Sequence, residues 1–251
     1  MIPAVVTAGG RLDGALAEAT GQTVKALISL DGTPLLRRVL SALEGSGVVR
    51  ETVVVGPMES LAPHVSHPNR LLPEADSGIA NLSRGLQAID AGEGFALVTA
   101  SDLPFLCVES VRWLVENAPQ DADIVFPITD RQRYEARFPG TPGAWTRLRE
   151  GELTASSVLL MRPAALERNR ALIERAFNAR KSQWQMAQLL GLGFALRFAA
   201  GRLSVAAAEA RATALTGCRC KALFHAPPHL ACDLDTHEEW LYLKGLVGET
   251  A

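Results

Sequence analysis

Apolar residues at the start of the chain form short runs separated by glycines and polar residues. Residues 4–6 are one such run and are predicted to form a buried strand. Residues 34–43 place apolar side chains at positions 35, 36, 39, 40 and 43, which is the spacing of an amphipathic helix. Residues 51–55 form a second apolar run that ends at Gly56. Together they predict a βαβ unit with two parallel strands and a right-handed crossover.

The same alternation continues through the first half of the chain. A weak third strand is predicted over residues 71–73, and a polar turn then opens a helix that runs to Ile89. Residues 94–100 form the most strongly apolar strand, followed by a predicted helix over residues 107–117 and a strand over residues 123–127. Because these strands are apolar throughout, helices are expected to cover both of their faces. The predicted fold class is α/β, with a doubly wound, mostly parallel sheet.

The second half of the chain has a less regular pattern. Residues 129–152 are rich in arginine, glycine and proline, and they indicate an irregular insertion or a β-excursion across the active-site side. Thr236 is a good N-cap for a last helix that begins at His237. The remaining predictions are a strand over residues 154–161, helices over 163–179, 184–190 and 203–215, and short strands over 221–225 and 231–236.

Composition and charge argue against several classes of protein. Of the 251 residues, 48% are hydrophobic and 21% are charged, which is ordinary for a globular chain with a sizeable core. The net charge of −2 argues against nonspecific binding to nucleic acid. The nearest approach to a membrane span, residues 189–200, is too short and contains Arg197. Because no secretory signal pattern is present, the four cysteines are expected to stay reduced in the cytoplasm.

Candidate chemistry begins in the loop after the first predicted strand. Ala8, Gly9, Gly10 and Arg11 follow that strand directly, and Lys25 precedes the next apolar patch. Glycines let backbone N–H groups approach an anion closely, and a basic side chain adds positive charge, so this loop suits a phosphate. Neither the P-loop pattern G-x-x-x-x-G-K-[ST] nor the dinucleotide pattern G-x-G-x-x-G occurs. A kinase-type or NAD-binding site is therefore not expected.

Two aspartates stand at the ends of later predicted strands. Asp102 directly follows the strongest strand, and Asp235 follows the short strand near the C-terminus. Ligands in such sheets bind at the carboxyl ends of the strands, so both aspartates are expected at the same edge as the glycine loop. Such a pair suits Mg²⁺, which takes one or two carboxylates together with substrate phosphates. The alternative interpretation is that each aspartate only caps a turn or a helix.

Three segments resemble the motifs of the MobA-like nucleotidyltransferases. They read AGGR, KAL and GTPLLRRVL near the N-terminus, VTASDLPFL in the middle, and DLDTHEEWL near the C-terminus, in the order of the family. The resemblance implies a three-layer α/β/α, Rossmann-like fold of the nucleotide-diphospho-sugar transferase type. We expect one domain over residues 1–251, in which residues 129–221 form an enlarged region on the acceptor side.

The resemblance also gives each candidate residue a role. Considered alone, Asn81 either caps the predicted helix or presents its amide to a nucleobase. Arg11 follows the glycines directly here, and residues 12–24 make a longer connection than is usual in the family. The implied roles are triphosphate binding for Ala8, Gly9, Gly10 and Arg11, phosphate neutralisation for Lys25, base contacts for Gly78 and Asn81, and Mg²⁺ binding for Asp102 and Asp235.

The implied activity is the transfer of a nucleoside monophosphate from GTP or CTP to a phosphorylated small-molecule acceptor, with release of pyrophosphate. GTP is slightly preferred, because molybdenum cofactor guanylyltransferases look most similar. One alternative is a glycosyltransferase with a nucleotide-sugar donor, and another is a non-catalytic nucleotide-binding domain. Glycosyltransferases on this kind of sheet usually carry D-x-D after the central strand, whereas Leu103 and Pro104 follow Asp102 here.

Overall fold

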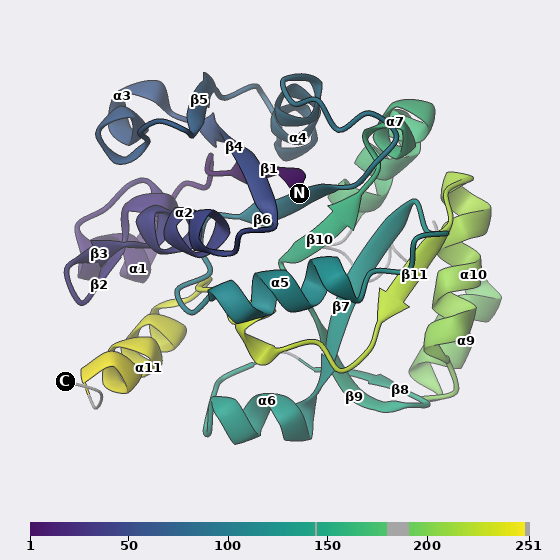
Figure 1. Cartoon of the computed structure of the whole chain (residues 1–251). Coiled ribbons are helices and arrows are strands. Elements are labelled where there is room, and N and C mark those ends of the chain that lie inside the picture. The colour runs from purple at the N-terminus through teal and green to yellow at the C-terminus, as the bar shows by residue number, and fades with distance from the viewer. Residues whose placement is uncertain (144, 180–190, 249–251) are drawn as a thin grey trace.

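A computed structural model describes residues 1–143, 145–179 and 191–248 of the chain (Figure 1). Its centre is one large twisted sheet. The strands of this sheet are β1 (Ile2–Thr7), β4 (Val49–Gly56), β5 (Arg70–Pro73), β6 (Ala96–Ala100), β7 (Ile124–Asp130), β8 (Thr146–Leu148), β9 (Gly151–Ala155), β10 (Val158–Met161) and β11 (Cys220–Leu223).

The order of the strands across the sheet is β5-β4-β1-β6-β10-β7-β9-β8, and β11 pairs with β7. The neighbouring pairs from β5 to β6 are parallel, as is the pair of β7 with β11. Within this sheet, only β10 and the β9–β8 hairpin introduce antiparallel pairs among the described residues. The predicted mostly parallel α/β sheet is therefore confirmed.

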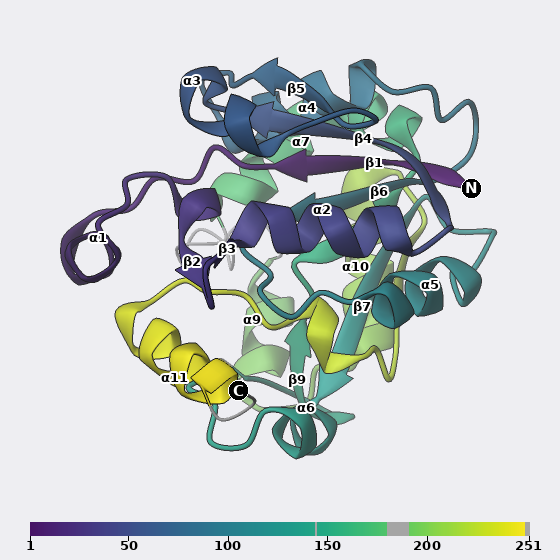
Figure 2. The ribbon, with the colours of Figure 1, turned by 60° about the vertical axis from the view of Figure 1, so that its left-hand side comes forward.

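Helices cover both faces of the sheet (Figures 1 and 2). Side chains of β1 alternate between two cores: Ala4 and Val6 face α2 (Leu35–Gly45) and α5 (Val108–Glu116), while Val5 faces α4 (Gly78–Gln87) and α7 (Pro163–Ala179). The remaining elements are α1 (Gly14–Thr20), α3 (Met58–Leu61), α6 (Arg131–Arg137), α9 (Leu192–Ala199), α10 (Val205–Thr216), α11 (His237–Gly248), the hairpin of β2 (Ser29–Leu30) and β3 (Thr33–Pro34), and three short 3₁₀ turns, η1 (Lys25–Leu27), η2 (Ala62–His64) and η3 (Pro228–Leu230). None of the described helices is both long and apolar enough to cross a membrane.

The predicted elements of the first half all form, with ends that shift by a few residues. In the second half, residues 129–152 include the predicted β-excursion, as the hairpin of β8 and β9, together with α6. The helices over 163–179 and 203–215 and the strand over 221–225 are confirmed as α7, α10 and β11. The prediction over 184–190 lies outside the described residues, and α9 was not predicted.

One predicted strand is divided in two in the structure, and another is wrong. Residues 154–161 form two strands, because the chain leaves one side of β7 at Ala155 and joins the other side at Val158. Between them the Ser156 hydroxyl donates to the carbonyl of Leu230 and accepts from the amide of Val158. Residues 231–236 form no strand, since the preceding chain turns in η3 and the segment then runs past the end of β6. A hydrogen bond fixes this segment there: the amide of Leu234 donates to the carbonyl of Asp102 at 3.1 Å.

Gly85→Ala is expected to destabilise the protein, because α4 packs directly on the sheet at this glycine. A Cβ at position 85 would overlap Cγ1 of Val5 and lie 3.2 Å from Cγ2 of Val55, and both valines are fully buried. Overpacking costs about 1–3 kcal/mol, which outweighs the ~1 kcal/mol by which alanine favours a helix over glycine. Urea denaturation should therefore show a lower free energy of unfolding.

Gly245→Ala in α11 is the matched control, because no atom lies within 4 Å of the added methyl group. It should leave stability unchanged or raise it by up to ~1 kcal/mol. Equal stability of the two variants would contradict the close packing of α4 on β1 and β4.

Candidate active site

The glycine loop follows the end of β1. Residues 12–24 then form a long excursion whose far end returns to the loop. Figure 2 shows β1 leading out to α1. The amide of Leu12 donates to Thr23 and the amide of Lys25 donates to Gly10, both at 3.0 Å, so the two ends of the excursion are paired. Residues 12–24 therefore lengthen the loop without moving Lys25 away from it.

Lys25 joins the glycine loop to both predicted metal ligands. Its ammonium nitrogen forms ion pairs with Oδ2 of Asp102 and Oδ1 of Asp235. Only 14% of the Lys25 side chain and 12% of the Asp102 side chain are exposed, against 64% for Asp235. Burial alone lowers the pKa of Lys25, but the charges and hydrogen bonds of Asp102 and Asp235 outweigh burial and raise that pKa above its ordinary value. The lysine is thus held as a cation.

The two aspartates reach one place from distant parts of the chain. Asp102 follows β6 through Ser101, and the neighbouring Leu103 is fully buried, which fixes the turn. The hydrogen bond from Leu234 to the Asp102 carbonyl then brings Asp235 alongside. Thr236 caps α11 as predicted: its hydroxyl accepts from the amide of Glu239, whose carboxylate accepts from the amides of Asp235 and Thr236.

Asp233 is a third carboxylate at this edge that the sequence analysis did not single out. Its Oδ2 accepts from the Ser157 hydroxyl at 2.6 Å. Burial, together with the negative charges of Asp102 and Asp235, raises the pKa of Asp233 to about 6, although the hydrogen bond from Ser157 lowers it. The acidic D-L-D pattern at 233–235 was the available signal, but only the β9–β10 break brings Ser157 to it.

The residues predicted to contact the base, Gly78 and Asn81, lie on the side of the glycine loop that is formed by Gly9. Ser77 caps α4, so Asn81 is not the cap; its Oδ1 instead accepts from the amide of Ala75. A Cβ on Gly9 would lie 3.0 Å from Nδ2 of Asn81 and 3.1 Å from Oε2 of Glu74, so the glycine permits this close approach.

Arg11 points to the same flank. Its guanidinium pairs with Glu74 and donates to the carbonyl of Gly9, and half of its side chain is exposed. Gly78 is the first residue of α4, and with Thr7 and Ser157 it lines a cavity of about 510 Å³. The structure therefore gathers all the predicted residues around the carboxyl ends of β1 and β6.

The site's residues fit a divalent metal ion. Oδ1 of Asp102 is buried and has no hydrogen-bond partner among the described residues. The described residues contain no group of three or more His, Cys, Asp or Glu side chains arranged to hold a metal. A pair of carboxylates is the donor set that Mg²⁺ uses when phosphates complete its coordination, whereas Zn²⁺ favours His and Cys.

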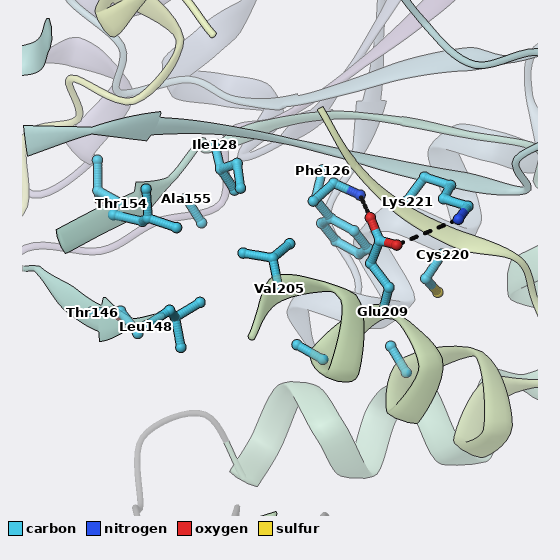
Figure 3. A pocket seen from close by; sticks show the side chains of 14 residues that line it. Phe126, Ile128, Thr146, Leu148, Thr154, Ala155, Val205, Glu209, Cys220 and Lys221 are labelled. Carbon is cyan, nitrogen blue, oxygen red and sulfur yellow. Dashed lines mark hydrogen bonds and ion pairs between the residues drawn. The ribbon is translucent and has the colours of Figure 1, made fainter. Parts of the chain in front are cut away.

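A separate apolar cavity of about 250 Å³ lies between β7, β9 and α10 (Figure 3). The two charged side chains that line this cavity already have partners. The Glu209 carboxylate accepts from the main-chain amide of Ala222 at 2.7 Å and forms an ion pair with Lys221. The candidate active site remains the edge at which Lys25 meets Asp102 and Asp235.

Fold and site together define an α/β protein with a glycine loop, a largely buried lysine and two carboxylates beside the end of β6. The model of one family, the MobA-like NTP transferase domain, matches residues 4–191. The chain belongs to this family.

Two curated relatives come from different branches of nucleotidyl transfer. A probable molybdenum cofactor guanylyltransferase of Pelotomaculum thermopropionicum is 32% identical over 125 residues, which cover 49% of this chain and 55% of the relative. A 2-C-methyl-D-erythritol 4-phosphate cytidylyltransferase of Streptomyces avermitilis is 30% identical over 133 residues, covering 47% and 53%. The chain thus spans about half the length of the curated relatives it matches.

Two solved structures resemble this chain over nearly its whole length. A hypothetical transferase from Thermus thermophilus has a TM-score of 0.83 and 34% identity, covering 95% of this chain and 99% of that one. A nucleotidyl transferase from Methanothermobacter has a TM-score of 0.58 at 19% identity, covering 100% and 99%, and shows the shared fold.

Proposed function

We propose that the protein transfers a nucleoside monophosphate from an NTP to a phosphorylated small-molecule acceptor and releases pyrophosphate. The observation that carries this proposal is the convergence of Lys25 on Asp102 and Asp235 beside the glycine loop. A largely buried cation and two carboxylates beside a glycine loop support this proposal, because such groups can stabilise the charge that develops during phosphoryl transfer.

In the proposed reaction an acceptor phosphate oxygen attacks the α-phosphorus, the bond to the β-phosphate oxygen breaks, and pyrophosphate leaves. The attacking oxygen is already anionic, so no general base is needed. The backbone of Ala8, Gly9 and Gly10 would bind the triphosphate, with Arg11 and Lys25 neutralising its charge. Gly78 and Asn81 would face the base.

Asp102 and Asp235 are the side chains that would hold Mg²⁺, and a bound Mg²⁺ would neutralise charge on the phosphates. A glycosyltransferase is the less favoured function, because Pro104, two positions after Asp102, stands where D-x-D would place its second acid.

GTP is the first nucleotide to test and CTP the second. The two curated relatives carry the names of a guanylyltransferase and a cytidylyltransferase. Near Gly9, the Asn81 amide and the Glu74 carboxylate offer a hydrogen-bond donor and an acceptor to a base edge. Both nucleotides present such groups, so the choice has to be measured.

Thermal unfolding with Mg²⁺ and each of GTP, CTP, UTP and ATP tests nucleotide binding. At a concentration of 100 times Kd, a nucleotide should stabilise the native state by about 2.7 kcal/mol. For a domain of this size that corresponds to a rise in Tm of roughly 5–10 °C. No rise with any of the four would favour a protein that does not use nucleotides.

Pyrophosphate release with the stabilising NTP and a set of phosphorylated acceptors then tests catalysis. Release is expected to stop when EDTA removes the metal and to return with added Mg²⁺. Binding without release from any acceptor would favour the non-catalytic nucleotide-binding domain, and turnover of a nucleotide-sugar would favour the glycosyltransferase.

A further inference from the structure

We propose that Lys25 is a built-in competitor of the metal ion: without metal and nucleotide, its ammonium holds the cation position between Asp102 and Asp235, and metal binding displaces it toward the phosphates. This inference rests on the proposed function, because it takes these two aspartates as the metal ligands. It adds that metal and lysine exclude one another at the same carboxylate oxygens.

The contacts of Lys25 carry the argument. The ammonium meets one oxygen of each aspartate, although these residues lie 77 and 210 positions further along the chain. Both oxygens belong to the carboxylates that would bind the metal. An ammonium and a divalent ion cannot share that space, so one must leave when the other arrives.

The charge balance favours exchange. Lys25 supplies one positive charge to two carboxylates, and Oδ1 of Asp102 remains buried with no hydrogen-bond partner in the described parts of the chain. A buried, unpaired carboxylate oxygen is costly, and a divalent cation supplies the charge that the lysine leaves uncompensated. Lys25 is therefore a replaceable partner of this site.

The displaced lysine has a nearby destination. Its amide donates to the carbonyl of Gly10, and its Cβ lies 3.4 Å from where a Cβ on Gly10 would be. Rotation of the side chain alone would keep the ammonium beside the glycine loop, where the triphosphate would bind. A nucleotide that attracts Lys25 would uncover the carboxylates, so metal and nucleotide should each increase the other's affinity.

The first experiment measures Mn²⁺ binding without nucleotide, by electron paramagnetic resonance of the free ion. Lys25→Met should bind Mn²⁺ about tenfold or more tightly than wild type, within the usual range of coupling between two ligands. Arg11→Met is the matched control. It removes a nearby positive charge that pairs with Glu74, and it leaves both aspartates paired with Lys25. Its affinity should change by less than about threefold.

Equal affinity of wild type and Lys25→Met would overturn the inference. Equal gains in Lys25→Met and Arg11→Met would also overturn it, because the effect would then come from net charge alone. The double variant Lys25→Met with Asp102→Asn should lose the gain, and a gain that survives would place the metal elsewhere.

A second measurement uses the wild-type chain and so does not depend on whether a variant folds. The chain has four lysines, at positions 25, 181, 221 and 244. Acetylation followed by mass spectrometry should show Lys25 becoming several-fold more reactive when Mg²⁺ alone is added. The exposed Lys221 and Lys244 serve as internal references. Unchanged reactivity of Lys25 at saturating Mg²⁺ would overturn the proposal.

These results separate from those that test the proposed function. If wild type releases pyrophosphate but Lys25→Met binds Mn²⁺ no more tightly, the competition is wrong and the transferase stands. If Lys25→Met gains affinity for Mn²⁺ but the wild-type protein turns over no NTP, the competition stands and the transferase is wrong.

Discussion

Asp102→Asn is expected to lower the rate of pyrophosphate release by about 10²–10³-fold while the protein stays folded. This is the loss seen when one preorganised electrostatic group is removed from an active site. Asparagine has a side chain of the same size, and the main-chain carbonyl of residue 102 that accepts from the amide of Leu234 is unchanged. Asp235 should therefore keep its position. What changes is the charge that would hold the metal.

The rate should be measured at saturating NTP over a series of Mg²⁺ concentrations, with circular dichroism to confirm the fold. Asp121→Asn is the control, because Asp121 is an exposed aspartate in the turn before β7. It should keep the wild-type rate. Wild-type turnover by Asp102→Asn would show that the metal assignment is wrong.

The sequence predicts the fold well where a strand is a single apolar run. Residues 4–6, 51–55 and 94–100 are such runs, and all three became central parallel strands. The prediction failed at residues 154–161, where the apolar run is continuous but the chain changes sides of β7. The local pattern of apolar residues predicts that a segment is extended, but it does not predict which strands the segment pairs with.

The candidate site was predictable as a set of residues and not as a set of contacts. Strand ends indicated the glycine loop and Asp102, because ligands gather at the carboxyl edge of such a sheet. The pairing of Lys25 with Asp235 joins residues 210 positions apart, and no local pattern encodes it. It depends on the amide of Leu234 reaching the carbonyl of Asp102.

Two further residues were missed for the same reason. Glu74 reaches the loop only because the chain folds back from β5 to α4, and its contacts with Gly9 and Arg11 follow from that turn. Asp233 became part of the site through Ser157, which lies in the middle of the single strand predicted over residues 154–161. Each miss is a long-range contact made by a loop.

Lys25→Met is expected to have the second large effect, a loss of about 10²–10³-fold in kcat with the metal bound. The methionine side chain fills a similar volume but cannot neutralise the charge that develops on the departing pyrophosphate. The loss should appear mainly in kcat, because that charge is greatest in the transition state. Steady-state pyrophosphate release measures it, and Lys244→Met, on the outer face of α11 against Trp240, is the control.

The same substitution should weaken the fold when no metal is present. It leaves the nearly buried Asp102 without its cation, and an unsatisfied buried partner costs about 1–3 kcal/mol. Mg²⁺ should then raise the Tm of Lys25→Met more than that of wild type, because the ion takes the place of the lost ammonium. The variant would thus gain metal affinity and lose turnover together. Wild-type kcat in Lys25→Met would instead reduce Lys25 to a structural partner of Asp102.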